Sequence, residues 1–83
     1  MIYYVDIDET ICEYKGDREY SKATPIHKNI NTINRLYDEG HTVVYWTARG
    51  TVTGIDWTEL TTKQLHSWGV KYTELLLKKP HYD

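Results

Sequence analysis

The chain has 83 residues, a formal net charge of −2 and one cysteine. This length permits a single domain with a small core, to which three tryptophans and eight tyrosines supply bulky apolar area. The mixed charges exclude the basic stripe of a nucleic-acid-binding protein. No apolar run approaches the roughly 20 residues that span a membrane, and the amino end lacks a signal-peptide pattern. Because one cysteine cannot form an internal disulfide, we expect a cytoplasmic protein.

The first predicted element is a strand over residues 2–6, which leads into Asp6-Ile7-Asp8-Glu9-Thr10. In an extended chain, alternate side chains point to the same face. Asp6 and Asp8 should therefore converge at the carboxyl end of the strand, where ligands bind in open α/β sheets. Close carboxylates repel unless a cation lies between them, and Mg²⁺ favours oxygen ligands. The two acids could instead be solvated strand-end residues or helix-cap partners, but the surrounding pattern favours a site.

Residues 11–23 are polar and are interrupted by Gly16-Asp17. This composition predicts a flap or short hairpin that projects from the sheet and is too short to form a separate cap domain. Cys12 lies near the two acids, and we interpret it as a small buried residue and not as a nucleophile.

A helix is predicted to open with Thr24 as N-cap and Pro25 as its first residue, and to end at Gly40 in a left-handed conformation. Its apolar stripe has helical spacing and comprises Ile26, Ile30, Ile33, Leu36 and Tyr37. A second strand follows over residues 42–46, where a near-continuous apolar run is typical of a strand covered on both faces.

The segment 47–54 is a predicted loop, and Asp56 and Glu59 have the spacing of a capping box for a second helix. That helix has an imperfect apolar face and ends at Gly69, after which residues 70–77 lead into a third strand. The order of strand, flap, helix, strand, helix, strand predicts an α/β fold with a parallel sheet, because its crossovers should be right-handed.

Polar residues follow each predicted strand: Asp6 and Asp8 the first, Thr47 the second, and Lys79 the third. The carboxyl ends of parallel strands meet at one edge of a sheet. Two acids, a hydroxyl and a cation at that edge suit phosphoryl transfer to a carboxylate. Thr47 alone could be an ordinary strand-end hydroxyl, and Lys78 and Lys79 could be a solvated pair.

These motifs resemble the haloacid dehalogenase-like (HAD) phosphohydrolases. The first motif of that superfamily is an apolar strand ending Asp-x-Asp-x-Thr, which matches Asp6–Thr10; the second ends in Thr, as at Trp46-Thr47; the third is a Lys, here Lys79 before Pro80. The similarity is greatest to small, nearly capless members described as capsule or polysaccharide biosynthesis phosphatases. In those members, runs like Thr47–Gly50 and Lys79–Asp83 occur.

The resemblance covers nearly the whole chain and implies a fold for residues 1–83. This fold is a single HAD-like domain, a minimal Rossmannoid three-layer sandwich with a short parallel sheet of about three strands and two main helices. The flap over residues 11–23 takes the place of a cap.

The resemblance also implies roles for the site residues. Asp6 attacks phosphorus and becomes an aspartyl phosphate, and Asp8 acts as general acid and then general base. Mg²⁺ is held by the Asp6 carboxylate and the backbone carbonyl of Asp8. Thr47 holds phosphoryl oxygens, and Lys79 balances charge in the transition state.

Three further residues are assigned to the substrate site. Thr10 braces the loop after Asp8, and Ala48 and Arg49 belong to the loop that contacts the phosphorylated small-molecule substrate. For Arg49, binding of substrate phosphate and a surface salt bridge are equally supported alternatives. The four histidines are scattered and show no metal-ligand spacing.

HAD phosphohydrolases carry a fourth, acidic motif on a further strand beside the first, and this chain ends where that motif would begin. We therefore expect magnesium to lack one carboxylate and the first strand to lack a neighbour. An apolar edge strand invites pairing, which predicts a homo-oligomer formed by pairing or swapping of strand one.

Two other functions remain open. The first is a truncated HAD-like protein with weak or no turnover that serves as an oligomeric binding or scaffold module. The second is a phosphoacceptor domain of the receiver type, which we rank last because no acid follows Trp46.

Overall fold

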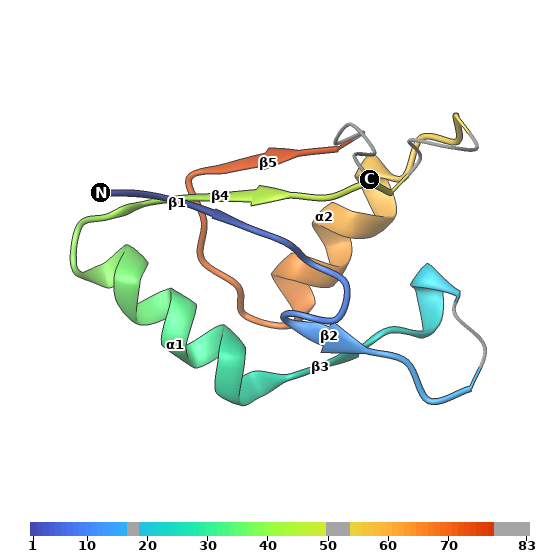
Figure 1. The fold of residues 1–83 in the computed structure, drawn as a ribbon. Helices are drawn as coiled ribbons and strands as arrows, with labels where there is room; N and C mark the ends of the chain where they lie inside the picture. The colour runs from blue at the N-terminus through green and yellow to red at the C-terminus, as the bar shows by residue number, and fades with distance from the viewer. Residues whose placement is uncertain (17–18, 50–53, 78–83) are drawn as a thin grey trace.

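The structure, a computed structural model, describes residues 1–16, 19–49 and 54–77. Its main elements are the strands β1 (Ile2–Val5), β4 (Thr42–Trp46) and β5 (Glu74–Leu76) and the helices α1 (His27–Asp38) and α2 (Thr58–Ser67). The three strands form one parallel sheet in the order β1-β4-β5 (Figure 1). The predicted α/β class, with a short parallel sheet and two main helices, is confirmed.

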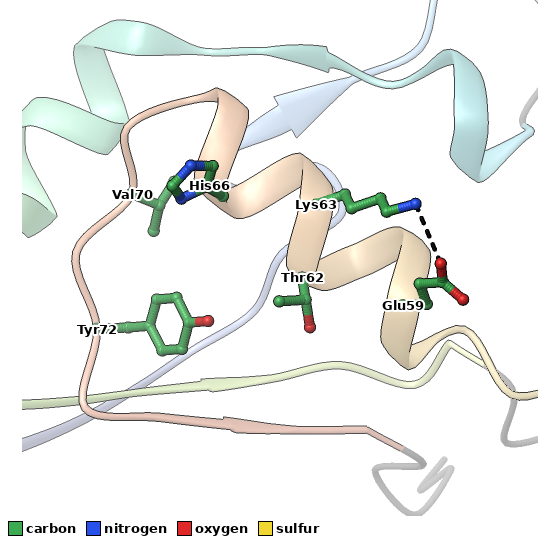
Figure 2. Close-up of a pocket in the computed structure, with 6 residues that line it drawn as sticks. All are labelled: Glu59, Thr62, Lys63, His66, Val70 and Tyr72. Atoms are coloured by element: carbon green, nitrogen blue, oxygen red, sulfur yellow. Dashed lines mark ion pairs between the residues drawn. The ribbon is translucent and has the colours of Figure 1, made fainter.

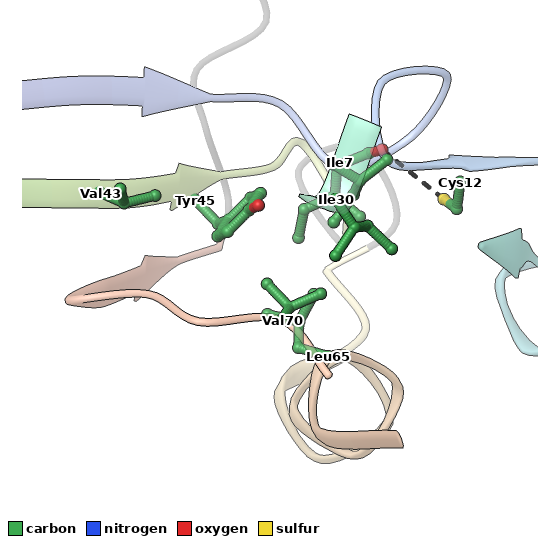
Figure 3. Close-up of a cluster of buried hydrophobic side chains, with 8 residues drawn as sticks. Ile7, Cys12, Ile30, Val43, Tyr45, Leu65 and Val70 are labelled. Atoms are coloured by element: carbon green, nitrogen blue, oxygen red, sulfur yellow. Dashed lines mark hydrogen bonds between the residues drawn. The ribbon is translucent and has the colours of Figure 1, made fainter. Parts of the chain in front are cut away.

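Both helices pack on the same face of the sheet. Val43 and Tyr45, which alternate along β4, are fully buried in a cluster that contains Ile30 of α1 and Leu65 of α2 (Figure 3). The described residues therefore form two layers, where the sequence predicted three. The chain crosses from β1 to β4 and then from β4 to β5 in the same direction across the sheet. Because both crossovers have the same handedness, both helices lie on the same face.

The opposite face of the sheet is largely exposed. Ile2 and Tyr4 are both 62% exposed, and Leu76 is 41% exposed. On this face Val44 is buried, although no helix among the described residues covers it; it lies in register between Tyr4 and Glu74. The continuous apolar run of β4 therefore reflects its central position in the sheet and not a second helical layer.

The flap forms a small antiparallel hairpin. β2 (Cys12–Glu13) pairs with β3 (Thr24–Pro25), and the backbone N–H of Ile26 donates to the carbonyl of Ile11 at 2.8 Å. The predicted helix start at Thr24 and Pro25 is therefore wrong, since both residues belong to a strand. α1 begins at His27 without a side-chain cap.

The second helix also begins later than predicted. The Asp56 carboxylate accepts a hydrogen bond from the backbone N–H of Thr58 at 2.9 Å, which closes a turn before the helix. α2 then starts at Thr58, and Glu59 lies in its first turn, where it forms an ion pair with Lys63 at 3.0 Å. The predicted capping box is therefore not formed.

Both predicted helix ends are present. Gly40 follows α1 with φ 93° and Gly69 follows α2 with φ 72°, a region that glycine enters without strain. In the part of the chain that the structure describes, neither helix has the length and apolar character required to cross a membrane.

Candidate functional site

The carboxyl ends of the three strands meet at one edge of the sheet. Val5 pairs with Tyr45, and Trp46 pairs with Leu76, so the residues that follow are Asp6 after β1 and Thr47 after β4. The backbone N–H of Thr47 donates to the carbonyl of Leu76 at 3.0 Å, which continues this alignment. Asp6 and Thr47 therefore follow neighbouring strands at the same edge of the sheet.

The backbone leaves the strand before the two acids. β1 ends at Val5, and the carbonyl of Ile7 accepts from the N–H groups of Thr10 at 3.2 Å and Ile11 at 3.0 Å. Glu9 has a positive φ of 67° within this turn. The alternation of an extended strand does not continue through the acids: Asp6 is exposed, whereas Asp8 is half-buried.

Asp8 forms a buried bidentate ion pair with Arg49. The Nε of Arg49 donates to Oδ2 of Asp8 at 3.1 Å and its Nη2 donates to Oδ1 at 2.8 Å. The Arg49 side chain is fully buried and that of Asp8 is 15% exposed. Of the two alternatives for Arg49, the ion pair is therefore present, but it lies in the interior and not at the surface.

Other groups also contact the Asp8 carboxylate. The Tyr14 hydroxyl donates to its Oδ1, and the Cys12 thiol lies 3.5 Å from the same oxygen. Burial by itself would raise the pKa of Asp8, but the hydrogen bonds and charge of Arg49, together with the Tyr14 hydrogen bond, hold it below its usual range. Asp8 is therefore ionised at neutral pH.

Cys12 is a structural residue in this arrangement. Its side chain is fully buried, and burial together with the charge of Asp8 raises the pKa of the thiol to about 11. A thiol with so high a pKa is a poor nucleophile at neutral pH, which agrees with the interpretation made from the sequence.

Helix α2 and the flap complete the surroundings of Arg49. Its Nη1 donates to Thr61 Oγ1 at 3.1 Å and to Gln64 Oε1 at 2.7 Å, and the Tyr20 ring lies 4.6 Å from its Cζ. Sequence reasoning missed all three partners. The sequence feature that could have indicated these partners is the imperfect apolar face of α2. On that face, the polar residues Thr61 and Gln64 lie three positions apart and are buried.

The other predicted site residues have different environments. Thr47 is 2% exposed, and its hydroxyl oxygen accepts from the backbone N–H of Arg49 at 3.2 Å. The carbonyl of Thr10 accepts from Asn29 Nδ2 at 2.8 Å, which ties the turn to α1. Ala48 is exposed at the same edge of the sheet. Lys79, and Lys78 beside it, lie outside the described residues.

The described residues offer a limited set of ligands for a metal ion. Among them, no group of three or more His, Cys, Asp or Glu side chains is arranged to hold one. The Asp8 carboxylate is engaged by Arg49 through both oxygens, so the candidate ligands at this edge are the Asp6 carboxylate and the Asp8 backbone carbonyl. This set suits Mg²⁺, which commonly binds one or two carboxylates and completes its shell with water and substrate phosphate.

Among the residues that the structure describes, two hollows lie near α2. A hollow of about 370 Å³ is lined by Glu19, Tyr20, Ser21 and Trp57, between the flap and the start of the helix. A larger one, of about 530 Å³, lies between α2 and the segment that leads to β5; it is lined by Glu59, Thr62, Lys63, His66, Val70 and Tyr72 (Figure 2). No predicted site residue lines either hollow. The smaller of these two hollows adjoins the site, because Tyr20 also contacts Arg49.

Comparisons with known proteins support the fold. No model of a known protein family matches the chain, and no curated protein matches it either. Among solved structures, the crystal structure of an MCSG target from Vibrio cholerae superimposes with a TM-score of 0.85. The two chains are 25% identical, and the match covers 96% of this chain and 71% of the other. The α/β architecture is therefore shared with a crystal structure over nearly the whole chain.

Proposed function

We propose that the protein is a HAD-like, Mg²⁺-dependent phosphohydrolase that cleaves a phosphate monoester through an aspartyl-phosphate intermediate. The observation that supports this most strongly is the placement of Asp6, Asp8 and Thr47 at the carboxyl edge of a parallel sheet, with Asp8 joined to the loop after β4 by Arg49. This is the edge where ligands bind in open α/β sheets. Lys79 completes the proposed set.

In the proposed reaction, a carboxylate oxygen of Asp6 attacks phosphorus and the ester oxygen leaves. Water then attacks the phosphorus of the aspartyl phosphate, which releases inorganic phosphate and restores Asp6. Asp8, which is ionised at neutral pH, accepts the proton of that water. The Thr47 hydroxyl and nearby backbone N–H groups hold the phosphoryl oxygens.

Mg²⁺ bound to the Asp6 carboxylate and the Asp8 carbonyl would supply neutralising charge between an anionic nucleophile and an anionic substrate. Protonation of a leaving alcohol by Asp8 requires that Asp8 first take up a proton against the influence of Arg49. Esters with stable leaving anions, such as aryl phosphates, avoid this requirement and are the appropriate first probes.

The second candidate is a HAD-like binding or scaffold module that has weak or no turnover. Its support is the absence, among residues 1–16, 19–49 and 54–77, of a group of three or more side chains that could hold a metal ion. Phosphate binding without turnover is the outcome that this candidate predicts.

One experiment separates the two candidates. We expect hydrolysis of p-nitrophenyl phosphate that requires Mg²⁺, disappears with EDTA and is lost in Asp6→Asn. Asp38→Asn is the matched control, because Asp38 lies at the exposed end of α1 in an ion pair with Lys71. A folded wild-type protein that releases no phosphate under these conditions would rule out the enzyme and support the binding module.

We also propose that β1 pairs with a second copy of the chain. In the described residues β1 has β4 on one side and no strand on the other, and Ile2 and Tyr4 expose apolar surface on it. An uncovered apolar edge of this kind favours strand pairing.

A further inference from the structure

The guanidinium of Arg49 is saturated by the protein itself. An arginine side chain carries five N–H donors. In this structure, Nε donates to Asp8, Nη2 to Asp8 and to the Tyr14 hydroxyl at 3.5 Å, and Nη1 to Thr61 and Gln64. Every donor therefore has an acceptor within the protein, and none remains for a substrate phosphate in this arrangement.

The same side chain connects three separate parts of the molecule. Asp8 belongs to the turn after β1, Tyr14 and Tyr20 to the flap, and Gln64 to α2. Gln64 also donates from Nε2 to the carbonyl of Tyr20, and the ring of Tyr20 covers the guanidinium. The orientation of the Asp8 carboxylate is thus coupled to the position of the flap against α2.

We infer that Arg49 is a positioning residue that fixes the Asp8 carboxylate and ties it to the flap and α2, and that it does not bind the substrate phosphate. This inference rests on the proposed function, in which Asp8 must face the reacting water. A bidentate pair constrains both carboxylate oxygens at once. Misplacement of a catalytic group by ~1 Å can cost on the order of 100-fold in rate.

The geometry requires arginine in particular. Lysine keeps the positive charge but presents a single nitrogen, which cannot hold two carboxylate oxygens in a plane and also reach Thr61 and Gln64. Arg49→Lys should therefore preserve charge and lose orientation. Lys63→Met on the exposed side of α2 is the matched control, since its side chain is 74% exposed and pairs with Glu59.

The test is steady-state hydrolysis of p-nitrophenyl phosphate with Mg²⁺. For Arg49→Lys we expect kcat to fall by about 100-fold, with KM within about threefold of the wild-type value. The control variant should keep both constants. A KM that rises with kcat retained would assign Arg49 to substrate binding, and unchanged constants would remove any role; either result overturns the inference.

A second measurement does not depend on catalysis and separates failure of this inference from failure of the proposed function. In ¹⁵N NMR spectra of the wild-type protein, the Nε–H of Arg49 should exchange slowly, and exposed Arg35 provides the reference. In Asp8→Asn, the Arg49 signal should exchange fast and the backbone amides of Tyr20–Lys22 should shift. Exchange of Arg49 at the Arg35 rate in the wild type, or unshifted flap amides in the variant, would overturn the inference even if the enzyme is inactive.

Discussion

At the scale of single residues, the contrast between Asp6 and Asp8 dominates the site. Both follow β1, yet Asp6 is exposed, whereas Asp8 is half-buried against a fully buried arginine. Removal of one partner from a buried pair costs more than the pair itself contributes, because it leaves a charge uncompensated. The Asp8–Arg49 pair is therefore as important for folding as for the proposed chemistry.

The lowered pKa of Asp8 predicts a pH dependence of stability. Its contribution to the free energy of unfolding is present above the pKa of an unfolded aspartate, about 3.9, and is lost as the pH falls towards the lower folded value. We expect Asp8→Asn to lower the free energy of unfolding by roughly 3 kcal/mol at pH 7. It should also flatten the fall in stability below about pH 4. Urea unfolding between pH 2 and 7 in EDTA measures both effects.

Asp38→Asn provides the matched comparison for this prediction, because the Asp38–Lys71 pair is about half exposed on both sides. An exposed pair contributes about 0–1 kcal/mol, so this variant should follow the wild-type pH profile. Parallel profiles for the wild type and Asp8→Asn would contradict the prediction.

At the scale of elements, the ends of the helices were easier to predict than their beginnings. Gly40 and Gly69 terminate helices because few other residues adopt their backbone angles. Thr24 has the chemistry of an N-cap but pairs with Glu13 in the hairpin, and Asp56 closes a turn that precedes α2. Polar turn-forming residues have several possible partners, and only the tertiary fold selects among them.

The requirement for glycine at a helix end can be tested at the end of α2. Gly69 has φ 72°, and a Cβ at this position would meet no atom within 4 Å, so the cost of a side chain is confined to the backbone. We expect Gly69→Ala to lower the free energy of unfolding by about 1–2 kcal/mol. Gly69→Asn should cost less, because asparagine tolerates the left-handed region.

Chemical denaturation of the two variants measures this difference. Thr62→Ala, at an exposed position within α2, should change the free energy of unfolding by no more than about 0.5 kcal/mol. Equal losses for the alanine and asparagine variants would show that backbone conformation is not the cause.

The core-facing residues of the two helices show what a sequence pattern can and cannot predict. In α1, the predicted Ile30, Ile33 and Leu36 face the core, whereas Tyr37 at the margin is 39% exposed. In α2, Thr61 and Gln64 occupy core-facing positions because they receive a buried arginine. Arg49 and Asp8 are 41 residues apart in sequence, so periodicity alone could not identify this pairing.

At the scale of the whole molecule, the sheet was the most predictable part. The run Val43-Val44-Tyr45 is buried throughout, and such a run is typical of a central parallel strand. The placement of both helices on one face was not predicted, because strand order decides it and no local pattern encodes strand order. The edge that gathers Asp6 and Thr47 follows directly from the parallel arrangement.

The side of β1 that no described strand covers leads to a prediction about assembly. We expect the wild-type protein to sediment as a dimer at micromolar concentration, and Ile2→Lys together with Tyr4→Lys to convert it to a monomer, because charged side chains oppose edge pairing. Leu76→Lys places the same charge on β5, at the far side of the sheet, and should leave the dimer intact.

Two results of analytical ultracentrifugation would contradict this prediction. A stable wild-type monomer at micromolar concentration would refute self-association. Dissociation by Leu76→Lys as well as by the β1 variants would show that the copies meet through the face of the sheet and not through the β1 edge.

The exposed side chains of Ile2, Tyr4 and Leu76 also affect how the folding of this protein can be followed. Fluorescent dyes such as ANS usually report molten-globule states of a chain, because those states expose hydrophobic surface. Here a fully folded monomer would already offer such surface. A bright dye signal from a fresh preparation would then not mean misfolding, and because pairing at the β1 edge leaves this face of the sheet open, the signal should persist as protein concentration rises.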